Sequence, residues 1–190
     1  MTTATGLAMR LAPGLVLCLI GGCTMRTEER LLALGGVHAL EASEPCQLAQ
    51  VEPAAALEDL HWKDALVVRA RGEGRAELTC GKTHARLRVV APARLDLVLV
   101  EDHVAVGRRF SVRAVPRDRD GHELEIGKWT ELTWHADGAV VTDTDRSAGE
   151  FGQCDGCFGV HGFRATAAGD ATIDAKLGDA AGSLKITTRP

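Results

Sequence analysis

Aromatic side chains are scarce in this sequence. Tyrosine is absent, and all aromatic residues together make up 4% of the 190 residues. Apolar residues still account for 45% of the chain, which is enough for a packed core, although alanine and valine supply much of that share. We therefore expect a core of small aliphatic side chains. The lack of tyrosine also argues against a sugar-binding face built from stacked aromatic rings.

The sequence also has no block of basic residues. Its 22 lysines and arginines are outnumbered by 26 acidic residues, which gives a formal net charge of −4 at pH 7. A mildly acidic surface repels phosphate instead of releasing its counterions, and no basic stretch is interleaved with aromatic residues. We therefore expect no nucleic-acid partner.

Motifs that carry enzyme chemistry are missing as well. No serine stands in a Gly-x-Ser-x-Gly setting, and no glycine-rich phosphate loop opens a helix. Residues 118–123 have the look of a calcium loop, but the glutamate at the twelve-residue spacing is missing, so we interpret them as a hairpin turn. Asp143 and Asp145 could pair as carboxylates for acid or base chemistry, but the alternation of exposed residues along a strand accounts for their spacing without it. We expect neither an enzyme activity nor a cofactor.

A separate N-terminal segment covers residues 1–22. Residues 1–10 carry one positive charge and no acid, and residues 11–20 are apolar apart from the interruption at Pro13 and Gly14. This pattern predicts a signal peptide, and the apolar run is too short to span a bilayer. We expect the segment to be removed from the mature protein.

The tetrapeptide Ile20-Gly21-Gly22-Cys23 closes this segment. It resembles the lipobox of bacterial lipoproteins, in which small residues fit the signal peptidase and the cysteine then receives acyl chains such as palmitate. The resemblance implies that lipid on Cys23 attaches the protein to the membrane; the alternative is a plain secretory signal cut near Gly22. Thr24, in place of aspartate, resembles the lipoproteins sorted to the outer membrane, facing the periplasm or the cell surface. Each buried methylene of such an anchor contributes about 0.8 kcal/mol.

The cysteines agree with export. Once the cysteine of the signal peptide is removed and Cys23 is acylated, an even number remains: Cys46, Cys80, Cys154 and Cys157. An even number in an oxidising compartment predicts two disulfides. Three pairings are open, but the two-residue gap makes Cys154–Cys157 a local pair and leaves Cys46–Cys80 as the long bridge.

Residues 23–36 are the expected tether between the lipid and the fold. The charged stretch 28–34, closed by Gly35 and Gly36, suggests a helix or an extended spacer. Beyond it, residues 66–68 and 87–90 are short β-branched runs bounded by glycine turns, which predict strands.

An internal repeat relates two hairpins. After Gly169, the residues Ala171, Ile173 and Ala175 alternate with polar residues, which is the period of a strand with one buried face. The same pattern, followed by a second strand, begins at Gly74. The offset of 169 − 74 = 95 residues suits one immunoglobulin-like sandwich.

The predicted fold class is therefore all-β, with two tandem immunoglobulin-like sandwiches. Residues 37–92 form a divergent or incomplete first unit, and residues 93–190 form the clearer second unit. Cys46 falls on an early strand and Cys80 on the penultimate one, a placement like the bridge between the two sheets of immunoglobulin folds. A disulfide that closes a loop of this length contributes about 3–4 kcal/mol on the chain-entropy model.

Short elements follow one another in a fixed order in the second unit: Val106-Gly107, residues 110–114, Asp120-Gly121, residues 132–134 and residues 169–173. This order resembles the bacterial Ig-like domains of group 2 (BIG2). In that family a Val-Gly precedes a strand, an Asp-Gly hairpin follows, a Thr-Trp enters the core, and a Gly-x-Ala-x-Ile strand leads to the last hairpin. The resemblance covers about residues 95–188. It implies a binding or structural module for an envelope protein or polysaccharide.

A glycine- and cysteine-rich insertion, residues 149–162, interrupts the family pattern. Asp155-Gly156 is a two-residue turn sequence flanked by Cys154 and Cys157, which predicts a hairpin tip closed by a disulfide. The insertion puts the usual passive role of this loop in question.

The alternative interpretation gives the insertion chemistry, as the site of a small extracytoplasmic metal-binding or thiol-redox protein. Cys154, Cys157 and His161 have ligand-like spacing, with His135 or His103 as a fourth donor. A zinc site normally shows a second clear pair of ligands. Dithiol redox chemistry is disfavoured further, because a reactive cysteine needs a helix N-terminus behind it and a glycine-rich stretch is a poor helix.

Overall fold

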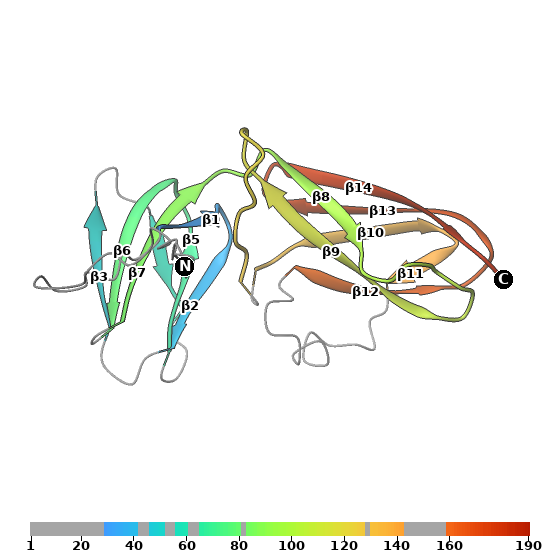
Figure 1. Ribbon diagram of the computed structural model, residues 1–190, viewed down its shortest axis with the longest axis horizontal. Coiled ribbons are helices and arrows are strands. Elements are labelled where there is room, and N and C mark those ends of the chain that lie inside the picture. The colour runs from blue at the N-terminus through green and yellow to red at the C-terminus, as the bar shows by residue number, and fades with distance from the viewer. Residues whose placement is uncertain are drawn as a thin grey trace, which may run out of the picture.

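The computed structural model describes residues 29–41, 46–51, 56–60, 65–80, 83–127, 130–142 and 159–190. These residues form strands and no helix (Figure 1). None of them therefore belongs to a helix that is long and apolar enough to cross a membrane. The signal peptide, Cys23, Cys154 and Cys157 lie outside the described residues. The roles that the sequence assigns to them therefore stay predictions.

The first sandwich packs a four-stranded sheet, in the order β1-β7-β6-β3, against a three-stranded sheet, in the order β2-β5-β4. Its strands are β1 (Glu29–Ala33), β2 (Val37–Glu41), β3 (Cys46–Val51), β4 (Leu57–Asp59), β5 (Ala65–Ala70), β6 (Gly74–Cys80) and β7 (Thr83–Val90). All pairs are antiparallel except β1 with β7, which is parallel.

The second sandwich repeats this plan. Its four-stranded sheet has the order β11-β12-β9-β8, and its three-stranded sheet has the order β10-β13-β14. The strands are β8 (Arg94–Leu99), β9 (Arg109–Arg117), β10 (Thr133–Gly138), β11 (Val140–Thr142), β12 (Val160–Ala165), β13 (Gly169–Leu177) and β14 (Ala180–Thr188). The order β3-β6-β7 of the first sandwich reappears as β10-β13-β14, and β2-β5-β4 reappears as β9-β12-β11. The fold is thus all-β with immunoglobulin-like sandwiches.

The core of the first sandwich is aliphatic. Its buried side chains come from the inward faces of β1, β5, β6 and β7: Leu32, Val68, Ala70, Ala76, Leu78, Ala85, Leu87 and Val89. None of these described core residues is aromatic, as the composition leads us to expect.

The core of the second sandwich combines aliphatic and aromatic side chains. Ala171 and Ile173 face inward as the alternation predicts, with Ile173 fully buried. The ring of Phe163 stacks against Phe110 at 5.7 Å and meets the edge of Trp134 at 5.8 Å between centroids. Trp134 therefore enters the core, as the BIG2 resemblance implies.

The expected tether is shorter than predicted. Glu29–Ala33 form β1 in place of a helix or a spacer. Leu32 is fully buried in the first core, while Ala33 is equally buried against residues of the second sandwich. A strand that is covered on both faces reads as a continuous apolar run, which explains why the sequence shows no alternation in this stretch.

The expected placement of Cys46 and Cys80 in opposing sheets is wrong. β3 lies beside β6, and the two cysteines are direct partners in this antiparallel pair. They therefore share one sheet, because the residue-by-residue pairing of β3 with β6 fixes their position in the plane of that sheet.

Candidate functional site

The junction between the sandwiches is made by residues 123–127, which we call the bridging segment. The amide of Ala33 in β1 donates to the carbonyl of Glu125 at 3.0 Å, and the amide of Glu125 donates to the carbonyl of Leu31 at 2.7 Å. On its other side, the amide of Leu124 donates to the carbonyl of Pro116 in β9 at 2.9 Å. Hydrogen bonds therefore connect a sheet of the first sandwich to a sheet of the second.

Glycines allow this close approach. A Cβ at Gly127 would overlap the carbonyl oxygen of Val37, and a Cβ at Gly36 would lie 3.3 Å from the carbonyl oxygen of Glu125. Any larger residue at position 127 would push the bridging segment away from β2.

An apolar cluster fills the space behind the bridging segment. It contains side chains of both sandwiches: Ala33, Leu95, Leu124, Ile126, Ala175, Leu177 and Ala180, with Leu31, Val90, Leu97, Leu132 and Trp134 packed at its margin. Leu124 is 1% exposed. Burial of apolar surface contributes about 25 cal/mol per Å², so this cluster supports the backbone ladder.

Polar contacts surround the cluster. The hydroxyl of Thr130 accepts a hydrogen bond from the amide of Val37 at 3.0 Å. Arg69 of β5 pairs with Glu131 at 3.2 Å. Both contacts cross from one sandwich to the other, which adds to the backbone hydrogen bonds and the apolar packing.

One histidine is buried at this junction. His38 of β2 is 8% exposed, its Nδ1 lies 3.7 Å from a carboxylate oxygen of Glu125, and its Nε2 has no hydrogen-bond partner among the described residues. Burial lowers the pKa of His38; the Glu125 carboxylate opposes this shift, and the charge of Arg30 adds to it.

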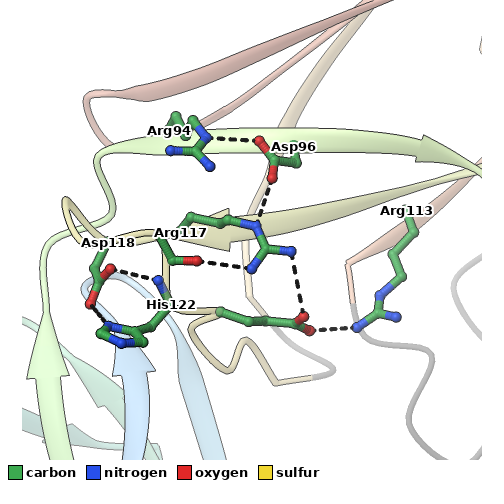
Figure 2. Close-up of polar contacts among 8 residues, drawn as sticks. Arg94, Asp96, Arg113, Arg117, Asp118 and His122 are labelled. Carbon is green, nitrogen blue, oxygen red and sulfur yellow. Dashed lines mark hydrogen bonds and ion pairs between the residues drawn. The ribbon is translucent and has the colours of Figure 1, made fainter.

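An arginine network lies on the outer face of the second sandwich, beside the bridging segment (Figure 2). Asp96 accepts hydrogen bonds from Arg94 at 2.9 Å and from Arg117 at 2.6 Å. These bonds lower the pKa of Asp96. Glu123 pairs with Arg113 at 2.8 Å and with Arg117 at 4.0 Å, so the network also holds the start of the bridging segment to β9.

The loop that resembled a calcium site is a hairpin turn, as predicted. One carboxylate oxygen of Asp118 accepts the amides of Asp120 and His122, and the other lies 3.0 Å from Nδ1 of His122. Burial alone would raise the pKa of Asp118, but the bonds to His122 outweigh it and lower the pKa. The three side chains could hold a cation by their spacing. In the structure, both carboxylate oxygens of Asp118 instead make hydrogen bonds within the turn.

The third member of the proposed metal set, His161, is half-buried against the core of the second sandwich. Its ring stacks on Trp134 at 5.3 Å between centroids, and burial lowers its pKa. His135 follows Trp134 on β10 and is exposed, so it points to the opposite face of that strand. Among the described residues, neither His135 nor His103 joins His161 in a metal-ligand cluster.

Sequence reasoning missed the junction altogether. The signals that could have found it are weak: Gly127 closes a stretch in which Leu124 and Ile126 alternate with acidic and glycine residues. That alternation is too short to distinguish from a loop.

Comparison with known protein families and with curated proteins gives no match to this sequence. Similar solved structures include domains 5–6 of the S-layer protein SbsC, with 12% identity and a TM-score of 0.36 over 86% of this chain and 94% of that chain. The Escherichia coli adhesin FdeC shows 17% identity and a TM-score of 0.37 over 83% of this chain and 60% of its own. Invasin, a bacterial integrin-binding protein, shows 14% identity and a TM-score of 0.40 over 84% of this chain, which spans 38% of the invasin chain.

Proposed function

We propose that this chain is a non-enzymatic module of the bacterial cell envelope in which two immunoglobulin-like sandwiches act as one stiff unit. The observation that carries this proposal is the bridging segment, which is hydrogen-bonded to β1 on one side and to β9 on the other. Domains on a flexible linker reorient freely, whereas a shared ladder with an apolar cluster behind it keeps one orientation. Such a unit holds a binding or structural surface at a fixed distance and angle.

The proposal includes a lipid anchor at Cys23. Five residues, 24–28, separate Cys23 from the start of β1 at Glu29. A fully extended chain spans about 3.3–3.6 Å per residue, so the first sandwich would lie within about 20 Å of the membrane surface. β1 runs from that end towards the junction (Figure 1), so in our proposal the second sandwich lies on the side away from the membrane. Its partner, in our proposal, is an envelope protein or polysaccharide, the class that the BIG2 resemblance implies.

A disulfide between Cys46 and Cys80 is also part of the proposal. The register of β3 and β6 supports it, because opposed residues of an antiparallel pair have Cα atoms about 4.5–5.5 Å apart. That spacing lies within the span of a disulfide, about 4.4–6.8 Å. The bridge would tie the edge strand β3 to its sheet.

Membrane fractionation of a Cys23→Ser variant in a Gram-negative host tests the anchor. We expect the full chain to be found in the outer-membrane fraction with a mass increased by its acyl chains, and the variant to lose both. Cys18→Ser is the matched control, because Cys18 lies within the signal peptide, and it should leave both unchanged. A Cys23→Ser protein that still reaches the outer-membrane fraction, or a wild-type chain without the added mass of acyl chains, would overturn the lipid anchor.

A further inference from the structure

His38 occupies an unusual place in the junction. Its imidazole is buried on the first sandwich where the bridging segment crosses, with Nδ1 3.7 Å from Glu125. A proton on Nδ1 faces that carboxylate, which leaves Nε2 as a buried nitrogen with no partner among the described residues. Protonation would add an N–H donor at Nε2 with nothing to accept its hydrogen bond. A buried, unsatisfied donor is costly.

The charged groups around His38 come from two of the elements that pack against it. β1 contributes Arg30, whose guanidinium pairs with Glu125 at 3.3 Å, and the bridging segment contributes Glu125 itself. On β5 the residue opposite His38 is the apolar Val68, in the fully buried part of the first core. The Glu125 carboxylate thus interacts with both His38 and Arg30, so it would stabilise a protonated His38 imidazole only in part.

We propose that the junction is a pH-sensitive latch, in which protonation of His38 releases the bridging segment from β1 and lets the two sandwiches reorient. Release would expose the imidazole to water, where the second N–H finds a partner. The inference rests on the stiff junction of the proposed function, and it does not depend on the lipid anchor. The proton is the signal for this latch. At neutral pH a partner would meet two sandwiches in one fixed orientation, and in acid it would meet two sandwiches that reorient.

The sign follows from the two states of the junction. Burial lowers the pKa of His38 in the closed junction, whereas in the open junction it returns to its ordinary value of about 6.5. The closed state is therefore fully favoured above that ordinary value. It weakens as pH falls, until the pH reaches the closed-state pKa. Between about pH 7.5 and pH 5.5, the open-to-closed ratio should rise by up to about tenfold, a limit set by the ordinary pKa of the open state.

Hydrogen exchange on the full chain measures this ratio directly. The amides of Ala33 and Glu125 make the two hydrogen bonds between β1 and the bridging segment, so their protection factors report junction opening. We expect both factors, corrected for intrinsic exchange chemistry, to fall by up to about tenfold over that pH range. Amides in the centre of β13 should keep theirs. Low protection of Ala33 and Glu125 already at neutral pH would instead contradict the stiff unit of the proposed function.

Variants identify the titrating group. His38→Phe keeps a buried ring without a titrating nitrogen, and we expect protection at Ala33 and Glu125 to become independent of pH in this range. His103→Gln removes an exposed histidine of the second sandwich and should leave the tenfold response intact. A wild-type chain without a response, or a response that survives in His38→Phe, would overturn the latch.

A second variant covers the case in which His38→Phe does not fold. Glu125→Gln keeps the backbone bonds of the bridging segment but removes the charge that favours protonated His38. The closed-state pKa of His38 should then fall further, so the pH response should persist and be no smaller than in the wild type. Loss of the response in Glu125→Gln would mean that the carboxylate and not His38 titrates, which also overturns the latch.

Discussion

The two sandwiches repeat one set of hydrogen bonds around a glycine turn. In the first, Ala70 exchanges both backbone hydrogen bonds with the turn 35–36, and in the second, Ala165 does the same with the turn 107–108. The first glycine of each turn has a positive φ, 82° and 76°. The offset of 165 − 70 = 95 residues matches the offset between the repeated hairpins. The repeat thus extends beyond the hairpins that reveal it in the sequence.

The two sandwiches differ in the segment that precedes this turn. In the first, β1 pairs with β7 along Glu29–Ala33, and its free edge receives the bridging segment. In the second, pairing with the last strand is limited to a bridge between Ala105 and Arg189. A sandwich of this architecture can therefore either stand by itself or pair at one edge with a segment of the neighbouring sandwich. The length of one edge strand decides between the two.

The cores offer the first and largest test of this difference. Phe163→Ala should lower the free energy of unfolding by about 3–5 kcal/mol, because Phe163 is fully buried and its loss opens a cavity beside two aromatic rings. Leu87→Ala, at an equally buried position of the aliphatic core, should cost about 2–5 kcal/mol. Urea denaturation followed by tryptophan fluorescence measures both. A loss below about 1 kcal/mol for Phe163→Ala would show that the aromatic stack does not hold the second sandwich.

The proposed disulfide should stabilise the first sandwich alone. Cys80→Ala removes a bridge that closes a loop of 80 − 46 = 34 residues, so it should cost about 3–4 kcal/mol. Thermal unfolding without reductant measures the loss, and an intact mass shows whether the wild-type pair is two hydrogens short. With reductant, wild type and variant should converge. Identical unfolding in both conditions would rule out the bridge.

The junction can be opened without altering either core. Gly127→Ala introduces a methyl group that overlaps the carbonyl of Val37, and we expect it to cost about 1–3 kcal/mol, mostly as lost contact between the sandwiches. Hydrogen exchange should accelerate at Ala33 and Glu125 and remain slow within β13. Gly121→Ala is the control, because a Cβ there meets nothing within 4 Å, so its cost comes from the positive φ of 87° and not from a contact between the sandwiches. Equal exchange in both variants would mean that the bridging segment does not depend on this close contact.

The parts of the fold that could be predicted are those set by local pattern. The alternation of Ala171, Ile173 and Ala175 gives a strand with one buried face, and β13 has this face. The turn at residues 118–123 follows from the Asp118 side chain, which accepts the backbone amides of Asp120 and His122, and from Gly121, which adopts a positive φ. In each case the residues that decide the structure are close neighbours in the chain.

The junction could not be predicted, because its partners are remote. Leu32 forms a parallel bridge with Glu125, and 125 − 32 = 93 residues separate them. Glu125 is an exposed acidic residue whose backbone, not its side chain, makes the ladder. Pairing through backbone atoms does not require a periodic pattern of apolar residues, so the sequence carries no signal for it. The charge of residues 28–30 also masks the short strand that follows.

The glycine turns allow a finer test of the repeat. Gly35→Ala and Gly107→Ala both place a Cβ at positive φ, which costs roughly 1 kcal/mol each. A Cβ at Gly107 meets nothing within 4 Å, whereas one at Gly35 lies 3.3 Å from Cδ1 of Leu177 in the second sandwich. Gly35→Ala should therefore destabilise the chain more in urea titrations. A larger loss for Gly107→Ala would contradict the placement of the first turn against its neighbour.

The smallest effect concerns the arginine network of the second sandwich. Hydrogen bonds from Arg117 and Arg94 lower the pKa of Asp96, so its contribution is present above its unfolded pKa of about 3.9 and is lost as pH falls through the lower folded value. Because the carboxylate is 37% exposed, solvent screening limits the cost of Asp96→Asn at neutral pH to below about 1 kcal/mol.

Thermal unfolding of Asp96→Asn against pH checks this contribution. The difference from wild type should shrink in strong acid, where Asp96 is protonated in both states. Glu77→Gln, which breaks an exposed ion pair with Arg86 on the first sandwich, should cost less, because it removes one partner where Asp96→Asn weakens two. Equal losses for the two variants would show that the bonds to Asp96 do not act as a network.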